Sequence, residues 1–296
     1  MELNIITGRA GSGKSRFCIE NISHICTENP ENRVFLIVPE QFAIKAERRM
    51  LEAIPTEGVL NNEVLSFKRL THRVLNRYGG VNKKILNMSG RSMVLAHAFK
   101  LCQKQLAYYK IFSRSIWNVD KIMNLITELV RYGISPEQLS ETADRIDREA
   151  QSEELSVKLK ELSLVYHKYK ELLNTEYMDE LDMHRVLMEK LENEKPFEHS
   201  VVWIDEFTGF TTLELEIIEC LVRQCASVNI CMLAGSKGDQ TFKGVNYTLK
   251  LLGEIAERTG CKKNVRHIET DILPRFADNP ALAALEKEFG HYPCKP

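Results

Sequence analysis

The 296-residue sequence predicts an α/β fold, in which a parallel β-sheet is flanked by helices and interrupted by an inserted all-helical subdomain. Three observations predict it. Short apolar runs alternate with helical stretches over residues 1–84 and again over residues 199–296, whereas residues 85–198 show only helical periodicity. A glycine-rich motif directly follows the first apolar run. We therefore expect 1–84 and 199–296 to be the two parts of one domain, with 85–198 as the insertion.

The first part of the chain contains three expected strands, each followed by a helix. The apolar runs at residues 3–7 and 34–38 and the shorter run at 64–67 predict strands. A continuous apolar run bounded by proline, as at 34–38, is typical of a strand buried on both faces. The expected helices cover about residues 15–26, about residues 42–54, and the stretch that ends at Tyr78.

The middle of the chain repeats apolar residues at three- and four-residue spacing. We expect one helix that includes Phe99, a second that ends near Gly133, and a third over residues 155–172. Ser89 is the expected N-cap of the first of these helices. Apolar stripes of this kind are usually packing surfaces, so they predict a helical core rather than a binding site.

Strands and helices alternate again in the last part. Residues 201–204 and 228–234 are apolar and predict two further strands. Helices are expected over residues 212–225 and 247–259, separated from the second strand by a glycine-containing loop. This return of the alternating pattern is the reason for assigning the helical stretch as an insertion.

A phosphate-binding loop is the most specific motif in the sequence. The pattern G-x-x-x-x-G-K-[ST] is matched at every fixed position by Gly8-Arg9-Ala10-Gly11-Ser12-Gly13-Lys14-Ser15. Its backbone N–H groups are expected to face the phosphates of a nucleotide. Lys14 would reach the β- and γ-phosphates, and the Ser15 hydroxyl would ligate Mg²⁺. The motif therefore predicts a nucleotide-binding site with ATP and Mg²⁺ as ligands.

A carboxylate pair at the end of a second strand completes this site. Asp205 and Glu206 follow the apolar run at 201–204, where a parallel sheet binds its ligands. Asp205 is expected to hold Mg²⁺, and Glu206 to orient or deprotonate the attacking water. Lys14 and Asp205 lie 191 positions apart, which the helical insertion explains.

Charge is distributed unevenly although the whole chain has a formal net charge of −1. Residues 61–150 contain 15 basic and 8 acidic side chains, a net charge of +7. One interpretation is a solvated helical surface. The other is a face that contacts the phosphates of a nucleic acid, for which Lys68, Arg69 and Arg73 are the candidates.

Several classes of protein are excluded or disfavoured. No run of 18 apolar residues is present, so no membrane-spanning helix is expected. The first residues lack the basic and apolar segments of a signal peptide. The eight cysteines form no C-x-x-C pair, which disfavours a zinc site and fits buried, reduced thiols in a cytoplasmic protein.

Four segments resemble the AddB family, the B subunit of the bacterial ATP-dependent helicase/nuclease: ITGRAGSGKS, LIVPEQ, LSFKRL and IDEFTGFT. The order of elements is similar to the first motor domain of superfamily 1 helicases of the UvrD and RecB group. The resemblance implies a RecA-like P-loop domain that binds ATP and Mg²⁺. It also places Lys68, Arg69 and Arg73 in or beside a segment that borders single-stranded DNA in relatives.

The resemblance further implies partners and a process. The family forms a heterodimer with the A subunit of the helicase/nuclease, acts on single- and double-stranded DNA in double-strand break repair by recombination, and recognises a hotspot sequence. Its deoxyribonuclease domain and iron–sulfur cluster lie beyond residue 296, so this chain is expected to be an N-terminal fragment of a longer protein.

Two alternatives stay open. The first is a motor-like DNA-recognition scaffold that binds nucleotide without productive hydrolysis. The resemblance suggests it, because B subunits of this family are generally regarded as lacking robust motor activity, whereas the intact Asp205-Glu206 pair favours hydrolysis. The missing upstream glutamine element leaves the adenine selectivity open, and Gly238-Asp239-Gln240 only weakly resembles the helicase G-D-x-x-Q motif that couples the γ-phosphate to DNA. The second alternative is a P-loop NTPase unrelated to DNA. Whether the fragment itself is an enzyme is left open by the sequence.

Overall fold

The computed structural model divides the chain into two compact units. The α/β unit consists of Met1–Tyr78, Met188–Phe210 and Glu214–Pro296, and the helical unit of Gly79–Leu187 and Thr211–Leu213. The residues that the structure describes are 1–54, 61–80, 83–110, 116–149, 152–173, 177–178, 180–234, 242–270 and 273–289.

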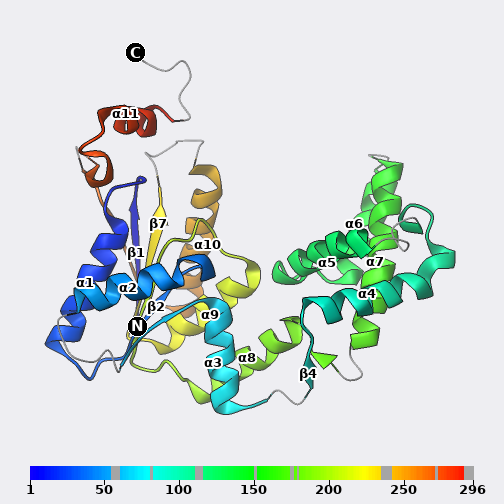
Figure 1. Ribbon diagram of the computed structural model, residues 1–296, viewed down its shortest axis with the longest axis horizontal. Helices are drawn as coiled ribbons and strands as arrows, with labels where there is room; N and C mark the ends of the chain where they lie inside the picture. The colour runs from blue at the N-terminus through cyan, green and yellow to red at the C-terminus, as the bar shows by residue number, and fades with distance from the viewer. Residues whose placement is uncertain are drawn as a thin grey trace. The chain divides into compact units, whose positions relative to one another are not determined.

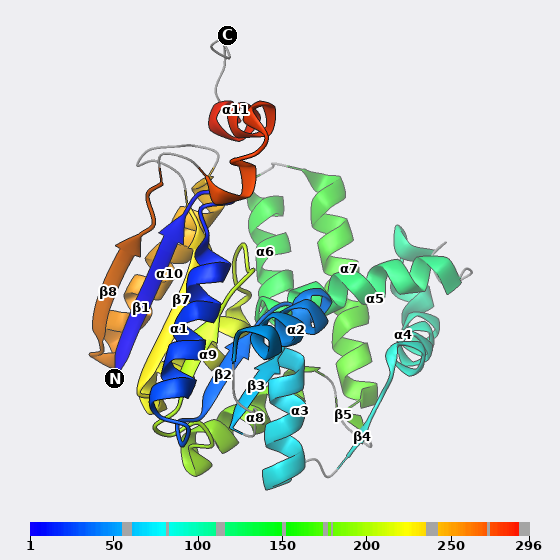
Figure 2. The same cartoon turned by 60° about the vertical axis from the view of Figure 1, so that its left-hand side comes forward.

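The α/β unit is built on a six-stranded sheet whose strand order is β3-β2-β6-β7-β1-β8. Every neighbouring pair is parallel, so the carboxyl ends of all six strands meet at one edge (Figures 1 and 2). In chain order the strands are β1 Glu2–Gly8, β2 Val34–Ile37, β3 Asn62–Leu65, β6 Val201–Ile204, β7 Ser227–Leu233 and β8 Lys262–His267. The predicted α/β fold with a parallel sheet is confirmed.

Helices cover both faces of this sheet. Figure 2 shows α1 and α2 in front of the strands and α9 and α10 behind them. The helices that belong wholly or mainly to this unit are α1 Lys14–Glu28, α2 Ala43–Ala53, α3 Phe67–Tyr78, α9 Thr212–Gln224, α10 Lys243–Thr259 and α11 Pro280–Glu288. Because both faces are covered, every residue of β2 is buried, as the continuous apolar run predicts.

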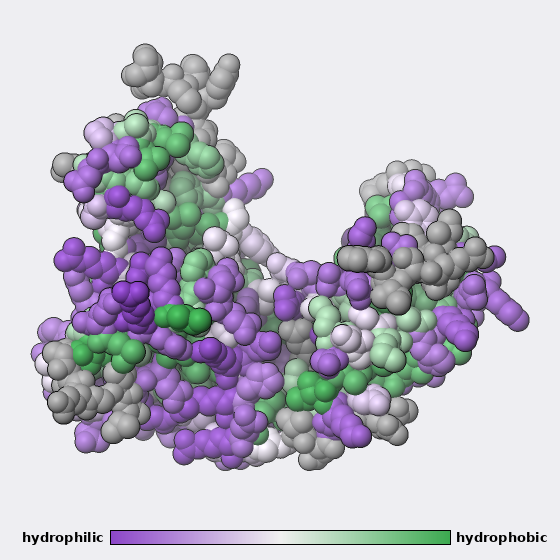
Figure 3. Space-filling view, in the orientation of Figure 1, coloured by the Kyte–Doolittle hydropathy of each residue, from purple (hydrophilic) through white to green (hydrophobic). Residues whose placement is uncertain are grey.

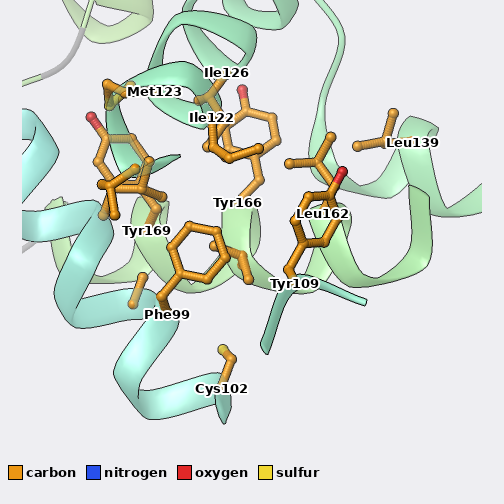
Figure 4. Packing of buried hydrophobic residues seen from close by; sticks show 14 of the residues in the cluster. Phe99, Cys102, Tyr109, Ile122, Met123, Ile126, Leu139, Leu162, Tyr166 and Tyr169 are labelled. Carbon is orange, nitrogen blue, oxygen red and sulfur yellow. The ribbon is translucent and has the colours of Figure 1, made fainter. Parts of the chain in front are cut away.

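The helical unit has its own core, formed by four helices. These are α4 Met88–Cys102, α5 Ile116–Arg131, α6 Pro136–Arg148 and α7 Glu153–Leu173. Phe99, Tyr166 and Tyr169 are almost fully buried and meet Met123 and Ile126 in the centre of the unit (Figure 4). The apolar stripes of the sequence are therefore packing surfaces in this unit.

Several details differ from the sequence-based expectations. Strand β8, helix α6 and helix α11 were not predicted. The helical unit also contains a two-residue parallel strand pair, β4 Lys84–Ile85 with β5 Tyr177–Met178. Helix α4 is capped by Asn87, whose side chain accepts the Gly90 N–H, so the expected cap at Ser89 is wrong.

One further helix, α8 Glu180–Glu194, contains the division between the two units, because Leu187 belongs to one and Met188 to the other.

Of the described helices, none combines the length and the apolar character needed to cross a membrane. Six of the cysteines are buried and form no disulfide among the described residues, as expected: Cys18, Cys26, Cys102, Cys220, Cys225 and Cys231. Cys261 is half-buried, which differs from the expectation, and Cys294 lies outside the described residues.

Candidate functional site

The loop between β1 and α1 follows a path that requires glycine. Gly11 and Gly13 have φ values of +78° and +93°, in the left-handed region that favours glycine. A Cβ atom on Gly8 would lie 2.6 Å from the Ser12 hydroxyl oxygen and 3.2 Å from the Ile268 carbonyl oxygen, so a larger residue there would require these neighbours to shift. Ala10 lies in the turn between Gly8 and Gly11, and Gly13 is the N-cap of α1. The glycines of the motif are thus needed for the backbone path of the loop itself.

Lys14, the first residue of α1, turns its side chain back onto this loop. Its Nζ donates hydrogen bonds to the carbonyl oxygens of Gly8 and Arg9, each at 2.8 Å. Burial lowers the pKa of the Lys14 ammonium below its ordinary value, and the negative charge of nearby Asp205 acts in the opposite direction. The ammonium is therefore held inside the loop by groups that an incoming anion could replace.

Asp205 directly follows β6, at the edge of the sheet that also carries the loop. Its N–H donates to the Ile37 carbonyl at 3.0 Å, and only 6% of the residue is exposed. Burial raises the pKa of the Asp205 carboxyl above its ordinary value, while a hydrogen bond from Ser15 acts in the opposite direction. A carboxylate that is buried without full compensation is typical of a group that binds a cation or a proton.

Glu206 approaches the same loop with a strained backbone. Its φ is +66°, which is uncommon for a residue with a side chain. The Ser15 hydroxyl donates to Glu206 Oε1 at 3.4 Å, and Arg49 Nη1 lies 3.8 Å from the same oxygen. The fold therefore brings Ser15, Asp205 and Glu206 close to one another.

The arrangement fits a phosphate and a divalent cation. Ser12 Oγ is buried and has no hydrogen-bond partner among the described residues, which leaves a polar atom of the loop available to a ligand. A Cβ atom on Gly13 would meet open space, so the backbone is approachable there. The hydroxyl of Ser15 and the carboxylate of Asp205 are oxygen ligands of the kind that Mg²⁺ prefers.

A segment near the C-terminus covers the loop, which the sequence did not indicate. Arg9 donates to the Glu286 carboxylate of α11 at 2.9 Å and to the Glu286 carbonyl at 2.6 Å. The Arg275 N–H donates to the Gly11 carbonyl at 3.4 Å. The ring of Phe276 stands so close that a Cβ atom on Gly11 would lie 3.0 Å from it. We call residues 273–289 the strap.

The predicted DNA-contacting residues all lie on α3, but they differ in exposure and in their ion-pair partners. Ser66 caps this helix by accepting the Arg69 N–H, and Lys68 and Arg69 are exposed in its first turn. Arg69 forms an ion pair with Glu47 at 2.8 Å. Arg73 is half-buried further along the helix. The surface over α3 is largely hydrophilic (Figure 3).

An aromatic cluster lies at the start of the same helix. The ring of Phe67 makes edge contacts with Phe207 and Phe210, at centroid distances of 5.4 and 6.3 Å. Phe207 and Phe210 belong to the loop after Glu206, so the cluster connects the carboxylate pair with the start of α3. Sequence patterns did not assign these two rings; their one signal was a place in the segment IDEFTGFT. Gly238-Asp239-Gln240 lies outside the described residues.

Comparison with known proteins identifies the family. The model of the family described as "ADDB, N-terminal" matches residues 5–286, nearly the whole chain. The chain belongs to the ADDB N-terminal family. This membership confirms the resemblance of the four sequence segments.

Similar proteins are named as the B subunit of an ATP-dependent helicase/deoxyribonuclease. One from Clostridium perfringens is 36% identical over 301 residues, which cover 100% of this chain and 26% of that protein. One from Thermoanaerobacter pseudethanolicus is 34% identical with the same coverage. One from Caldanaerobacter subterraneus is 34% identical over 299 residues, or 99% of this chain and 26% of the relative. This ADDB N-terminal chain thus spans about a quarter of the length of these relatives.

Proposed function

We propose that this chain is the nucleotide-binding, motor-like N-terminal region of the B subunit of an ATP-dependent helicase/deoxyribonuclease. One observation carries the nucleotide site: residues 191 positions apart in the sequence meet, because the Ser15 hydroxyl donates to Glu206 Oε1 at 3.4 Å, next to the buried Asp205. The relatives' name supports the wider assignment. The chain would bind ATP with Mg²⁺ and contribute to DNA binding.

Each side chain of the site has a distinct role in this proposal. The loop N–H groups would bind the phosphates, and Lys14 would exchange its two carbonyl partners for phosphate oxygens. Ser15 and Asp205 would hold Mg²⁺, which supplies charge neutralisation when bound. Glu206 would orient or deprotonate a water molecule, and its position near Ser15 supports this role.

DNA would approach the start of α3. Lys68 and Arg69 are exposed there and can neutralise phosphates. The half-buried rings of Phe207 and Phe210 contact the buried Phe67 at the start of this helix, and partly exposed aromatic rings at such a position can stack on unpaired bases. Arg73 stays a predicted DNA contact, although it is already engaged by a carboxylate, Glu63.

The wider role follows the family. The full-length protein would form a heterodimer with the A subunit of the helicase/nuclease. It would act as a helicase and exonuclease on single- and double-stranded DNA, and serve double-strand break repair by recombination in the cytoplasm. Hotspot recognition would involve the motor-like region. An iron–sulfur cluster is expected only in the part of the full-length protein that follows this chain.

Calorimetric titration with ATP and Mg²⁺ tests the nucleotide site. Lys14→Ala is expected to weaken binding at least about 100-fold, because it removes a charge-assisted contact to the phosphates. Lys45→Ala is the matched control, since Lys45 is an exposed cation on α2. Equal affinities of wild type and Lys14→Ala, or no binding by the wild type at millimolar nucleotide, would contradict the proposal.

A salt titration tests the DNA-binding face. In the full-length protein, the double variant Lys68→Glu, Arg69→Glu should weaken binding of single-stranded DNA and reduce the slope of log affinity against log salt by about 2. Arg48→Glu, on α2, is the control because Arg48 is exposed and paired with Glu52. An unchanged slope in the double variant would remove Lys68 and Arg69 from the interface.

A second candidate function is a DNA-recognition scaffold that binds nucleotide without turnover. It is favoured by the Lys14 contacts with the Gly8 and Arg9 carbonyls and by the ion pair between Arg9 and Glu286. ATP turnover with and without single-stranded DNA and the A subunit separates the two functions. Turnover that is lost in Glu206→Gln supports the enzyme, and nucleotide binding without turnover supports the scaffold. Nucleotide turnover without any DNA binding would instead indicate a P-loop NTPase unrelated to DNA.

A further inference from the structure

A second polar pocket lies at the edge of the sheet opposite the phosphate-binding loop. It has a volume of about 330 Å³ and is lined by Arg33, Phe35, Asn61, Glu63, Arg73 and Arg77. The lining residues of β2 and β3 come from the amino ends of these strands, whereas the loop follows the carboxyl end of β1. The pocket belongs entirely to the α/β unit and shares no residue with the phosphate-binding loop or the carboxylate pair.

Aromatic rings hold the three guanidinium groups of this pocket. The Cζ atoms of Arg33 and Arg73 each lie 5.3 Å from the centroid of the Phe35 ring. The Cζ atom of Arg77 lies 5.6 Å from the centroid of the Tyr78 ring. Attraction to a ring face limits where a guanidinium can lie and leaves its N–H groups able to donate hydrogen bonds. The pocket can therefore donate hydrogen bonds to a ligand.

The pocket has more positive charge than its own carboxylate neutralises. Arg73 Nη1 lies 2.7 Å from both carboxylate oxygens of Glu63. Within the described part of the chain, no carboxylate lies within ion-pair distance of Arg33 or Arg77. Within the described residues, the guanidinium groups of Arg33 and Arg77 thus line a partly enclosed pocket and have no carboxylate as a counter-charge. An anionic ligand would supply that counter-charge.

We propose that this pocket binds a phosphate group through Arg33 and Arg77, with Arg73 held in place by Glu63. The forked guanidinium matches the oxygen geometry of phosphate, and one phosphate can accept from two such groups. The volume is at the lower end of the range for small-ligand sites, which suits a phosphate with an attached sugar. The phosphate could belong to a small free ligand or to the backbone of a DNA strand.

The test uses the Lys14→Ala chain, in which the phosphate-binding loop makes a much smaller contribution. Inorganic pyrophosphate is titrated by calorimetry, and a fluorescent oligothymidylate by anisotropy. Arg33→Gln and Arg77→Gln are each expected to weaken pyrophosphate binding at least about tenfold, because each removes a charge-assisted contact. Arg48→Gln removes an exposed cation outside the pocket and should change binding less than about twofold.

A variant of opposite sign keeps the test sharp. Glu63→Gln removes the carboxylate from the residues that line the pocket, so it should strengthen pyrophosphate binding, while the new amide oxygen can still accept from Arg73. Circular dichroism checks that each variant is folded. Weaker pyrophosphate binding in the Arg77→Gln and Arg33→Gln variants, with stronger binding in Glu63→Gln, supports the phosphate site.

The two probes identify the source of the phosphate. Loss of oligothymidylate binding in parallel with pyrophosphate binding assigns the pocket to the DNA backbone, and loss of pyrophosphate binding alone assigns it to a small ligand. Binding of both probes that is indifferent to Arg33 and Arg77 overturns the proposal, as does the absence of pyrophosphate binding. Because Lys14 is already replaced, these results do not depend on whether the loop binds ATP.

Discussion

Each unit of the chain buries a carboxylate, and the two carboxylates differ in how they are satisfied. In the helical unit Glu161 of α7 is 7% exposed and accepts the N–H groups of Ala107, Tyr108 and Tyr109, at 2.7, 3.1 and 2.9 Å. In the α/β unit Asp205 is 6% exposed, and burial raises the pKa of its carboxyl. Burial alone therefore does not distinguish the two carboxylates; the extent to which hydrogen bonds compensate the buried charge does.

The consequence is a difference in role. Glu161 stabilises the backbone after α4, because its two oxygens accept hydrogen bonds from three consecutive N–H groups, of which that of Tyr109 is buried. Asp205 costs stability in its ionised form, because the burial penalty outweighs the Ser15 hydrogen bond and the nearby charge of Lys14. Substitution at the two positions should accordingly have opposite effects on the free energy of unfolding.

The largest expected effect is at Glu161. Glu161→Ala should lower the free energy of unfolding of the helical unit by about 3 kcal/mol, because it removes three hydrogen bonds to a charged group and leaves the buried Tyr109 N–H without a partner. Chemical denaturation followed by circular dichroism measures the loss. Glu154→Ala, on the same helix, is the control: Glu154 is mostly exposed and pairs with Lys158, so about 0.5 kcal/mol or less is expected. Equal effects of the two variants would remove the structural role of Glu161.

The second effect is smaller and has the opposite sign. Asp205→Asn should raise the free energy of unfolding of the α/β unit by about 1 kcal/mol at pH 7 in the absence of Mg²⁺, because it removes a buried charge. Glu40→Gln is the control because Glu40 is exposed, and it should change stability by less than about 0.5 kcal/mol. A clear loss of stability in Asp205→Asn would mean that the carboxylate is already satisfied.

The difference in the free energy of unfolding between the wild type and Asp205→Asn should depend on pH, because the pKa of Asp205 is raised in the folded state. The folded state holds the proton more tightly than the unfolded state, whose Asp205 has the ordinary pKa of 3.8. The stability from the protonated carboxyl is fully present below pH 3.8 and is lost as the pH rises through the folded-state pKa. The advantage of Asp205→Asn should therefore shrink as the pH falls toward 3.8, which denaturation curves between pH 7 and pH 4 can measure.

Much of the fold could be predicted from the sequence, and so could one of the two buried carboxylates, Asp205. Continuous apolar runs predicted β1, β2, β6 and β7, because strands buried on both faces contain few polar residues. The phosphate-binding loop and Asp205 were found from local motifs. Strand β8 was missed because it lies at the edge of the sheet and five of its six residues, KKNVRH, are polar or charged. Its signal is hydrogen bonding to β1, which only the folded chain provides.

Other features depend on contacts that sequence patterns do not contain. Glu153, Glu154 and Glu161 all lie on α7, and nothing local distinguishes the one that satisfies three backbone donors. The ion pair between Arg9 and Glu286 joins residues 277 positions apart. By contrast, the start of α6 had a local signal that was overlooked: Ser135 and Gln138 form a reciprocal capping box.

The smallest expected effect concerns a third carboxylate, Glu286, whose charge we expect to be compensated less completely than that of Glu161 and more completely than that of Asp205. Glu286 is half-buried and paired with Arg9, and its charge also acts on Lys14. Glu286→Gln should strengthen binding of ATP with Mg²⁺ about two- to fivefold, because it removes a negative charge near the phosphates and loosens the strap. Asp278→Asn, which removes an exposed charge from the strap, is the control and should leave the affinity unchanged.

Hydrogen exchange gives an independent measurement of the same ion pair. The Arg275 N–H donates to the Gly11 carbonyl, so it reports whether the strap stays closed over the loop. In Glu286→Gln without nucleotide this amide should exchange faster than in the wild type, and in Asp278→Asn it should not. Unchanged exchange together with unchanged affinity would mean that Glu286 is fully compensated, like Glu161. Faster exchange with tighter binding would mean that the charge of Glu286, like that of Asp205, is incompletely compensated and affects the affinity of the loop for its ligand.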